Sequence, residues 1–375
     1  MKNESKANKK IRVLQISGAM NMGGQETLIM NLFRNIDRDK FEFDFAVHDE
    51  KENYYEKEIK ELGGTMIRLS PMSKGPSKNF LGIKHCRDLA SVLKTNHYDV
   101  VHRHGNSGVI VLDLIVCRLC GVPMRIAHSH NTFCENKYIS LMVRPLFRNF
   151  ATKRLACGEE SGKALFGKQP FEVINNGIDL KKFHFSDSKR KSLRKKYKIN
   201  DSDTVLLNVG RLEKQKNHSF LIDVFKAYHK VNPHSKLVII GEGSLQKMLE
   251  DQISQYELTN NVLILPNQHN ISDFYNIADV FIMTSLFEGM PTVSVEAQAN
   301  GLQCVFSDVI TKEADHSGYT KFISLDAGAN AWAKLIAGLD LSRKSSDCGK
   351  IKEYDIKNVA QKISDIYLNR HKETE

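Results

Sequence analysis

The 375-residue sequence lacks several features that mark whole classes of protein. No apolar run approaches the ~20 residues that a membrane-spanning helix needs. Residues 1–10 are polar and lysine-rich without an apolar stretch, so we expect a disordered tail rather than a signal peptide, and a cytoplasmic location. Seven cysteines, an odd number, favour reduced thiols over a disulfide framework. Zinc-finger spacings, RNA-binding aromatic motifs and a recognisable helix-turn-helix are also missing, so we predict no nucleic-acid partner.

Negative charge is comparatively scarce. With 54 Lys and Arg against 44 Asp and Glu the net charge is +10, and the pI is near 9.1. Such a balance favours anionic partners, such as nucleotide phosphates or the acidic lipids of an inner membrane leaflet. Residues 137–154 mix apolar with basic side chains. They are interpreted as core-facing helices with a solvated basic face, and contact with a membrane surface is the alternative.

The length and the apolar pattern predict two α/β domains. Short apolar runs with strand character alternate with helical patterns near 55–61 and 82–95, which predicts a doubly wound parallel sheet. The runs cover residues 11–16, 41–47, 65–69, 100–104 and 124–130. The first run enters a glycine-containing loop, residues 18–26, without the G-x-G-x-x-G order of a dinucleotide site. That departure counts against an NAD enzyme.

Two glutamates with seven residues between them frame the most informative stretch. A buried strand is predicted at 280–283, followed by a loop with Glu288 and Gly289 and by a helix that contains Glu296. Ligands of open α/β sheets bind at this edge, and each carboxylate there can accept two hydroxyl hydrogen bonds from a sugar or ribose. For the pair taken alone, a simple contact of two carboxylates with the helix dipole stays open.

A cationic loop follows the strand predicted at 205–209. Gly210 and Arg211 stand at its beginning, and Lys216 and Asn217 lead into the next helix. The planar fork of an arginine and the mobile point charge of a lysine together suit a diphosphate, and both would neutralise charge on a leaving group. An arginine after a strand is often only a surface ion pair, but the two cations at this spacing are a more specific signal.

Two pairs of histidines end strands in the first half of the chain: His102 with His104, and His128 with His130. Strand alternation points both members of a pair to the same face. Cys117 and Cys120 lie nearby in sequence and suggest zinc, but they belong to an apolar helix where buried, inert cysteine is common. We therefore predict no metal. Hydrogen-bonded structural histidines are the simpler interpretation for the first member of each pair.

Together, and in their order along the chain, these segments resemble those of the retaining glycosyltransferases of family four, which have the GT-B fold. The E-x7-E stretch ends at Glu296, residues 210–217 match G-R-L-x-x-x-K-N, and residues 173–179 match V-I-x-N-G-I-D. The resemblance runs from about residue 11 to 368. It implies two Rossmann-like doubly wound α/β domains that face each other across a cleft.

The resemblance also implies domain limits. Residues 11–183 would form the acceptor-side domain and residues 184–355 the nucleotide-sugar-binding domain. Residues 356–375 would form a C-terminal helix that returns to the first domain.

Site residues follow from the same resemblance. The implied catalytic residues are His130, Arg211, Lys216 and Glu288. The implied substrate-binding residues are Gly23, Gly24, His104, Gly241, Gly289, Met290, Pro291 and Glu296. In the family, the second glutamate of E-x7-E holds the ribose and the first holds the donor sugar. The two cations and the amide of the second glycine grip the diphosphate, and the histidine of the second pair lines the sugar pocket.

The implied reaction transfers a hexose, with retention, from a nucleotide diphosphate sugar to a hydroxyl of a lipid-linked glycan in exopolysaccharide or capsule synthesis. A UDP-sugar is the expected donor, and no metal or other cofactor is implied. The partners would be the donor, the glycan acceptor and an anionic membrane surface, with the protein peripheral at the inner face of the membrane. A sugar-nucleotide epimerase of the same fold, and a nucleotide-sugar-binding subunit without turnover, are the alternatives.

Overall fold

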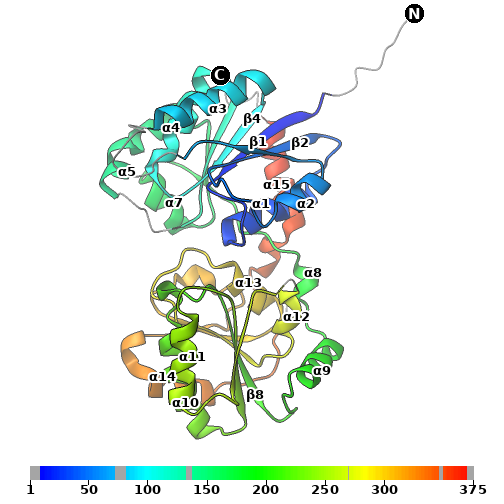
Figure 1. The fold of residues 1–375 in the computed structure, drawn as a ribbon, viewed down its shortest axis with the longest axis vertical. Helices are drawn as coiled ribbons and strands as arrows, with labels where there is room; N and C mark the ends of the chain where they lie inside the picture. The colour runs from blue at the N-terminus through cyan, green and yellow to red at the C-terminus, as the bar shows by residue number, and fades with distance from the viewer. Residues whose placement is uncertain (1–8, 72–81, 132–136, 269, 346–348, 370–375) are drawn as a thin grey trace, which may run out of the picture. The chain divides into compact units, whose positions relative to one another are not determined.

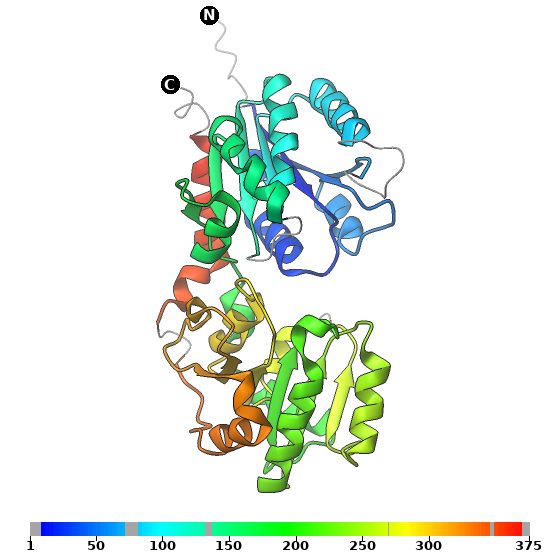
Figure 2. The same ribbon diagram turned by 90° about the vertical axis from the view of Figure 1, so that its left-hand side faces the viewer.

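The computed structural model describes residues 9–71, 82–131, 137–268, 270–345 and 349–369. Most of the tail expected at residues 1–10 lies outside these ranges. The chain divides into two compact units, one reaching Gly177 and resuming at Ile356, the other spanning Ile178–Asp355 (Figures 1 and 2). The division precedes the boundary expected at residue 183. The Ile178 amide donates to Tyr354 O at 2.9 Å, and Asn300 donates to Phe183 O at 2.8 Å, which ties 178–183 to the second unit.

The first unit contains a parallel sheet in the order β3-β2-β1-β4-β5-β6-β7. Its strands are β1 Ile11–Ser17, β2 Phe41–Val47, β3 Thr65–Arg68, β4 Val100–His104, β5 Met124–Ser129, β6 Lys153–Ala156 and β7 Glu172–Val173. Its described α-helices are α1 Gly24–Asn35, α2 Glu56–Glu61, α3 Ile83–Asn96, α4 Val111–Leu119, α5 Lys137–Val143, α6 Phe147–Phe150, α7 Glu159–Phe166 and α15 Ile356–Leu368. The doubly wound sheet predicted from the apolar runs is confirmed.

Alternation along the strands gives the sheet of this unit two apolar faces. One face of the sheet packs against α1 and α15, and the other packs against α3 and α4. Helix α15 joins the first core because its apolar residues recur at helical spacing, from Ile356 through Val359 and Ile363 to the fully buried Tyr367. Each such aliphatic side chain contributes ~1.5–3 kcal/mol on burial.

The second unit repeats the architecture in the order β10-β9-β8-β11-β12-β13, with described strands that are all parallel. The strands are β8 Thr204–Val209, β9 Ser235–Ile240, β10 Val262–Leu265, β11 Val280–Met283, β12 Gln303–Ser307 and β13 Lys321–Ile323. The described α-helices are α8 Leu180–Phe183, α9 Asp187–Lys196, α10 His218–Val231, α11 Gln246–Gln255, α12 Ile271–Tyr275, α13 Thr292–Ala299 and α14 Gly328–Ala337.

Both sheets have a point where the strand order reverses, between β1 and β4 in the first unit and between β8 and β11 in the second. The crossover connections leave these two strands in opposite directions, so the loops that follow the strands diverge. Their divergence leaves room for a ligand at the carboxyl ends of the two strands. The candidate residues of the cationic loop and of the glutamate pair follow β8 and β11. The fold therefore brings these two segments to one edge of the second sheet.

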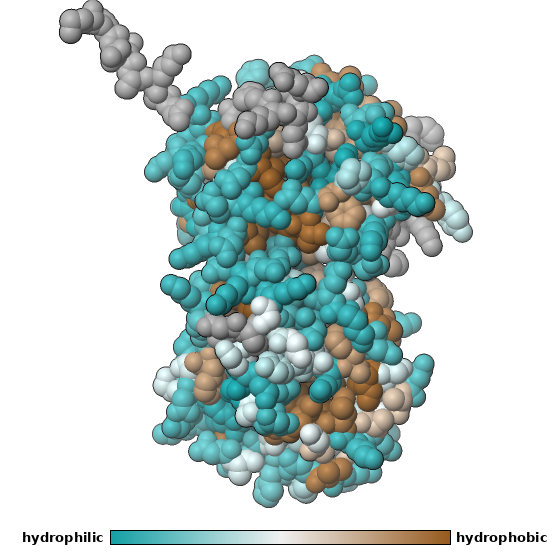
Figure 3. All heavy atoms as spheres, turned by 180° about the vertical axis from the view of Figure 1, so that it is seen from behind, coloured by the Kyte–Doolittle hydropathy of each residue, from teal (hydrophilic) through white to brown (hydrophobic). Residues whose placement is uncertain are grey.

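Within the described residues, no helix is long and apolar enough to cross a bilayer. The face in Figure 3 is mainly hydrophilic, with hydrophobic patches scattered across it.

Candidate active site

Two loops of the second unit meet after β8 and β11. The Leu286 amide donates to Gln215 O at 2.8 Å, and the Gln215 side chain donates to Phe287 O at 3.0 Å. The Thr284 hydroxyl donates to Lys216 O at 3.2 Å and to Asn217 O at 3.0 Å. These bonds fix the short 3₁₀ helix Lys214–Lys216 against the segment that carries the first glutamate.

The loops bring together Lys216 and Glu288, which the resemblance assigns to different parts of the donor. Lys216 Nζ lies 2.6 Å from Glu288 Oε1, and the Ser285 hydroxyl donates to the same oxygen at 2.7 Å. The two charged side chains are only 15% and 7% exposed. A lysine has three N–H donors, so Glu288 can orient the ammonium while other donors remain for a ligand.

Glycines let the strand-end turns approach closely. A Cβ on Gly210 would lie 3.1 Å from the Lys216 side chain, so the lysine stem passes directly over this residue. A Cβ on Gly241, which follows β9, would lie 2.0 Å from Gly210 O. Any side chain at position 241 would therefore push the cationic loop away. Arg211, the next residue of that loop, is exposed and open to an anionic ligand.

Glu296 lies on α13 and is 8% exposed. Burial raises the pKa of its carboxyl to about 7, while the hydroxyl of Tyr275 opposes that rise by donating to Glu296 Oε2 at 2.6 Å. One carboxylate oxygen is thus committed to a protein partner. Tyr275 was not predicted from the sequence, because an aromatic residue at the end of the short helix α12 carries no signal beyond core packing.

Between the glutamates the chain runs through Gly289, the buried Met290 and Pro291, which precedes the first residue of α13. At the start of this helix Thr292 Oγ1 is buried and has no hydrogen-bond partner among the described residues. A buried hydroxyl costs free energy unless it is paired, so this atom suits a ligand at the helix start.

In the first unit Gly24 begins α1 and Gly23 precedes it. The amide of Gly24 is thus one of the donors of a helix N-terminus that have no partner within the helix, which suits the predicted contact with a diphosphate. A carboxylate is already near, since a Cβ on Gly23 would lie 2.3 Å from Glu26 Oε2. Any anionic ligand at this helix start would have to displace that side chain.

The four strand-end histidines gather in one stack. Ring centroids lie 4.1 Å apart for His102 and His104 and 4.2 Å apart for His128 and His130. Burial lowers the pKa of His102 and of His130 to about 3. The pKa values of His104 and His128 also lie well below the usual range, mainly because of burial and in addition because of the neighbouring histidines. All four rings are therefore neutral near pH 7.

The zinc interpretation with Cys117 fails on geometry. The histidines stand on the face of the sheet that carries α1 and α15, whereas Cys117 packs with Leu14 and Val101 against the opposite face. His102, His104 and His128 do offer ring nitrogens within 4.8 Å of one another. Both nitrogens of His102, however, already have hydrogen-bond partners, as predicted for a structural histidine.

The sequence-predicted residues are divided between the two units. Gly23 and Gly24 at the start of α1, and the histidines at the ends of β4 and β5, belong to the first unit. Arg211, the Lys216–Glu288 pair, Gly241 and the loop to Glu296 belong to the second.

The protein has two doubly wound units, and the Lys216–Glu288 pair lies where the strand order of the second sheet reverses. These features define a two-domain α/β protein of the GT-B class. The crystal structure of Anabaena HepE in complex with UDP and glucose has this fold, with a TM-score of 0.75 at 18% identity over 95% of this chain and 99% of that one. Family models described as Glycosyltransferase Family 4 and Glycosyl transferases group 1 match residues 22–182 and 189–347.

Two relatives align over most of the chain. EpsF of Bacillus subtilis (strain 168) is 34% identical over 341 residues, which is 87% of either protein. The UDP-Gal:alpha-D-GlcNAc-diphosphoundecaprenol alpha-1,3-galactosyltransferase of Escherichia coli is 29% identical and covers 78% of this chain and 81% of its own length. The chain belongs to the group 1 glycosyltransferases, and the fold and family predicted from the sequence are confirmed.

Proposed function

We propose that this glycosyltransferase moves a hexose, with retention, from a UDP-sugar to a hydroxyl of a lipid-linked glycan in exopolysaccharide or capsule synthesis. The observation that supports this function best is the largely buried ion pair between Lys216 and Glu288. It lies where the strand order of the second sheet reverses, and its lysine is on the same loop as the exposed Arg211. The Escherichia coli relative, whose name specifies a UDP-sugar donor and a diphosphoundecaprenol-linked acceptor, supports the choice of both substrates.

Each charged group has a distinct role in the proposed site. Arg211 and Lys216 bind the diphosphate and neutralise the charge that develops on it as the sugar leaves. Glu288 orients the lysine and accepts hydrogen bonds from hydroxyls of the donor sugar, while the backbone amides of Gly289 and Met290 donate to the sugar oxygens. Glu296 accepts from the ribose hydroxyls. The two cations supply the positive charge that a divalent metal gives in metal-dependent transferases.

Retention follows from a reaction on one face of the sugar. The bond between the anomeric carbon and the diphosphate oxygen breaks, and the acceptor oxygen bonds to the same face of that carbon. The acceptor proton passes to the departing diphosphate, so no protein nucleophile or external base is needed. The products are the extended glycan and UDP. A sugar-nucleotide epimerase would instead invert one carbon of the sugar and return the epimeric nucleotide sugar, with no net release of UDP.

Thermal unfolding with a panel of nucleotide sugars tests donor binding directly. A UDP-sugar at a hundredfold its Kd should stabilise the protein by ~2.7 kcal/mol, and Arg211→Ala should abolish the shift. Lys247→Ala, which removes an exposed cation from α11 of the same unit, should leave it intact. If UDP-, GDP- and ADP-sugars all leave the melt unchanged, the proposed donor site is wrong. Free UDP that appears only with a lipid-linked glycan separates transfer from epimerisation.

Helix α5 supports the membrane part of the proposal. Tyr138 and Met142 are 83% and 80% exposed, and Ile139 and Leu141 are 49% and 44% exposed. The core-facing interpretation favoured from the sequence is therefore wrong for most of α5, although it holds for the buried Phe147 downstream. An exposed apolar helix on a basic protein suits the headgroup region of an anionic bilayer.

Replacing both Tyr138 and Met142 with serine should lower partitioning onto phosphatidylglycerol vesicles about tenfold, because partial burial of two large apolar side chains is lost. Transfer to a water-soluble acceptor should be unaffected. Leu119→Ser is the matched control, since this leucine is 81% exposed at the end of α4 in the same unit. Equal co-sedimentation of all three proteins would count against α5 as the contact surface.

A further inference from the structure

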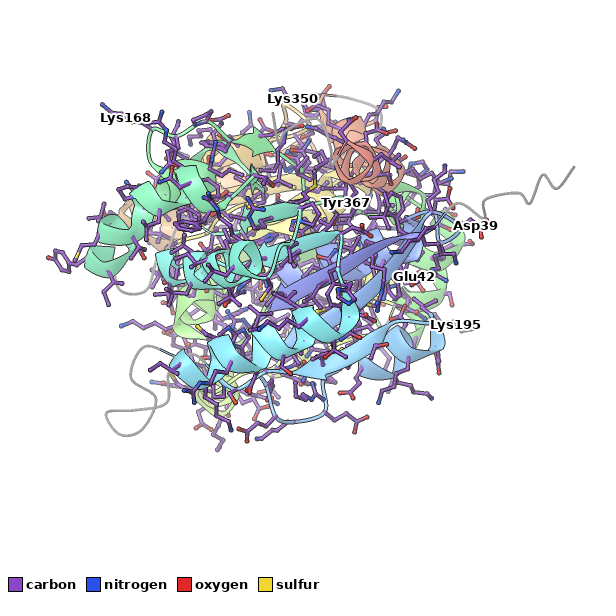
Figure 4. All side chains as sticks on the ribbon, turned by 90° about the horizontal axis from the view of Figure 1, so that it is seen from above. Asp39, Glu42, Lys168, Lys195, Lys350 and Tyr367 are labelled. Carbon is purple, nitrogen blue, oxygen red and sulfur yellow. The ribbon has the colours of Figure 1, made fainter. Side chains whose placement is uncertain are left out.

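Two buried side chains far apart in sequence connect the histidine stack. Gln15 on β1 donates from Nε2 to the hydroxyl of Tyr367 at 3.1 Å, and its Oε1 lies 2.7 Å from His104 Nε2. Tyr367, labelled in Figure 4, lies 2.7 Å from His102 Nδ1 through the same hydroxyl. Both side chains are buried, with exposures of 1% and 0%. The Gln15 amide thus contacts His104, and the Tyr367 hydroxyl contacts His102.

The first chain of hydrogen bonds runs from Gln15 to His130. A neutral imidazole has one N–H donor and one lone-pair acceptor. Gln15 Oε1 can only accept, so the proton of His104 is on Nε2 and its Nδ1 is an acceptor. His104 Nδ1 lies 2.8 Å from His130 Nε2, which must therefore carry the proton of His130. The remaining atom, His130 Nδ1, is a bare acceptor.

The second chain has the opposite polarity. Because Tyr367 accepts from Gln15, its own O–H donates to His102 Nδ1. The proton of His102 is then on Nε2, which lies 3.0 Å from His128 Nδ1. His128 consequently carries its proton on Nε2. This N–H is buried, as is His130 Nδ1, and neither atom has a hydrogen-bond partner among the described residues.

We propose that Gln15 and Tyr367 are positioning residues that fix the tautomers of the histidine stack, so that His130 presents a lone pair at Nδ1 to a sugar hydroxyl. This role rests on the proposed glycosyltransferase function and makes it more specific. His130 acts as a hydrogen-bond acceptor for that hydroxyl. It does not take up the acceptor proton, because a ring with a pKa of about 3 is a weak base.

The two chains are coupled because an amide has one donor end and one acceptor end. Turning the Gln15 amide by half a turn would reverse both chains together, so that His130 presented N–H and His128 a lone pair. Tyr367 joins the amide to His102 from α15, whose other buried residues belong to the same core. The direction of both hydrogen-bond chains therefore depends on the docking of the C-terminal helix α15.

The tautomers can be measured without any substrate. In two-bond ¹H–¹⁵N spectra of protein labelled at histidine, a bare nitrogen resonates far from a protonated one, and loss of one signal in His130→Gln assigns that ring. We expect His130 protonated at Nε2 in the wild type. In Gln15→Met and in Tyr367→Phe the polarity is no longer fixed, and His130 should become a mixture of tautomers. Tyr98→Phe removes another hydroxyl from the first unit, one that donates to Asp44, and should leave the spectrum unchanged.

A wild-type His130 protonated at Nδ1, or a His130 tautomer that is unchanged in Gln15→Met, would overturn the assignment. Thermal melts of each variant show that it is folded when its spectrum is recorded.

Kinetics separate this inference from the function on which it rests. Gln15→Met and Tyr367→Phe should lower kcat of sugar transfer about tenfold with a smaller change in KM, whereas Tyr98→Phe should not. If the tautomers shift as expected but the wild type transfers no sugar from any nucleotide donor, the hydrogen-bond network stands and the proposed function fails. If the tautomers shift and wild-type transfer is intact but kcat is unaffected in both variants, the positioning role is refuted.

Discussion

Replacing Lys216 with methionine should lower kcat/KM for glycosyl transfer about a thousandfold. Methionine keeps the length of the apolar stem that lies over Gly210 but removes the charge. The ammonium is held 2.6 Å from Glu288 by two interlocked loops, so it meets the diphosphate already in position. The missing charge is needed most when negative charge develops on the departing diphosphate, so the loss should be mainly in kcat. Steady-state kinetics at several donor concentrations measure it.

Stability must be separated from catalysis in this variant. Glu288 is only 7% exposed on its side chain, and removing one partner of a buried ion pair typically costs about 3–5 kcal/mol. The double variant Lys216→Met with Glu288→Gln removes both charges and should recover much of the lost stability. It should not recover the lost activity, because the cation is still absent.

Lys214→Met is the matched control for Lys216→Met, since it removes an exposed cation from the same 3₁₀ helix. It should change kcat/KM less than twofold, as exposed charges screened by solvent usually do. If Lys216→Met and Lys214→Met had the same activity, Lys216 would be only a partner of Glu288, and the diphosphate role would have to pass to Arg211 alone.

The segments that carry the site were predictable from the sequence, because glycines and charges at strand ends are local signals. The loop of Arg211 and the stretch from Glu288 to Glu296 follow short apolar runs that β8 and β11 confirm. The parallel sheet then brings both loops to the edge where the strand order reverses.

The pairings within the site were not predictable, because they depend on contacts between distant segments. Nothing near Lys216 in sequence indicates that its partner is Glu288, and nothing near Glu296 indicates Tyr275. The same holds for Gln15 and Tyr367, which lie at opposite ends of the chain. Buried polar groups need partners, but periodicity alone does not say which element supplies them.

The exposed face of α5 shows a different limit of the sequence. The segment has helical spacing of apolar residues, which ordinarily indicates a face buried in a core. In the structure α5 instead buries Ser140, whose hydroxyl accepts from the Gly108 amide at 2.9 Å, and exposes Tyr138 and Met142. Amphipathic spacing identifies an apolar face but not what covers it.

The affinity for a UDP-sugar should fall as the pH drops below about 7, because burial raises the pKa of Glu296 to about 7 in the free protein. Only the ionised carboxylate accepts from both ribose hydroxyls, so the ligand favours that form and binding below pH 7 releases a proton. The slope should approach tenfold per pH unit and vanish above the pKa. A UDP-sugar has no phosphate ionisation in this range, and His218 and His316 in the same unit stay neutral because burial lowers each pKa to about 4.

Two variants make the assignment of this pH dependence to Glu296 decisive. Glu296→Gln should bind a UDP-sugar roughly a hundredfold more weakly at pH 8 and without the slope, because an amide accepts less well and does not ionise. Tyr275→Phe removes the hydrogen bond that lowers the pKa of Glu296, so the midpoint of the profile should move above 7. Tyr256→Phe, which removes a hydroxyl that donates to Asp223 elsewhere in the unit, should leave the midpoint in place. Titration calorimetry in buffers of different ionisation enthalpy counts the released proton. If the midpoint does not move in Tyr275→Phe, or if the slope persists in Glu296→Gln, the ionising group lies elsewhere. The ribose would then be without its proposed acceptor.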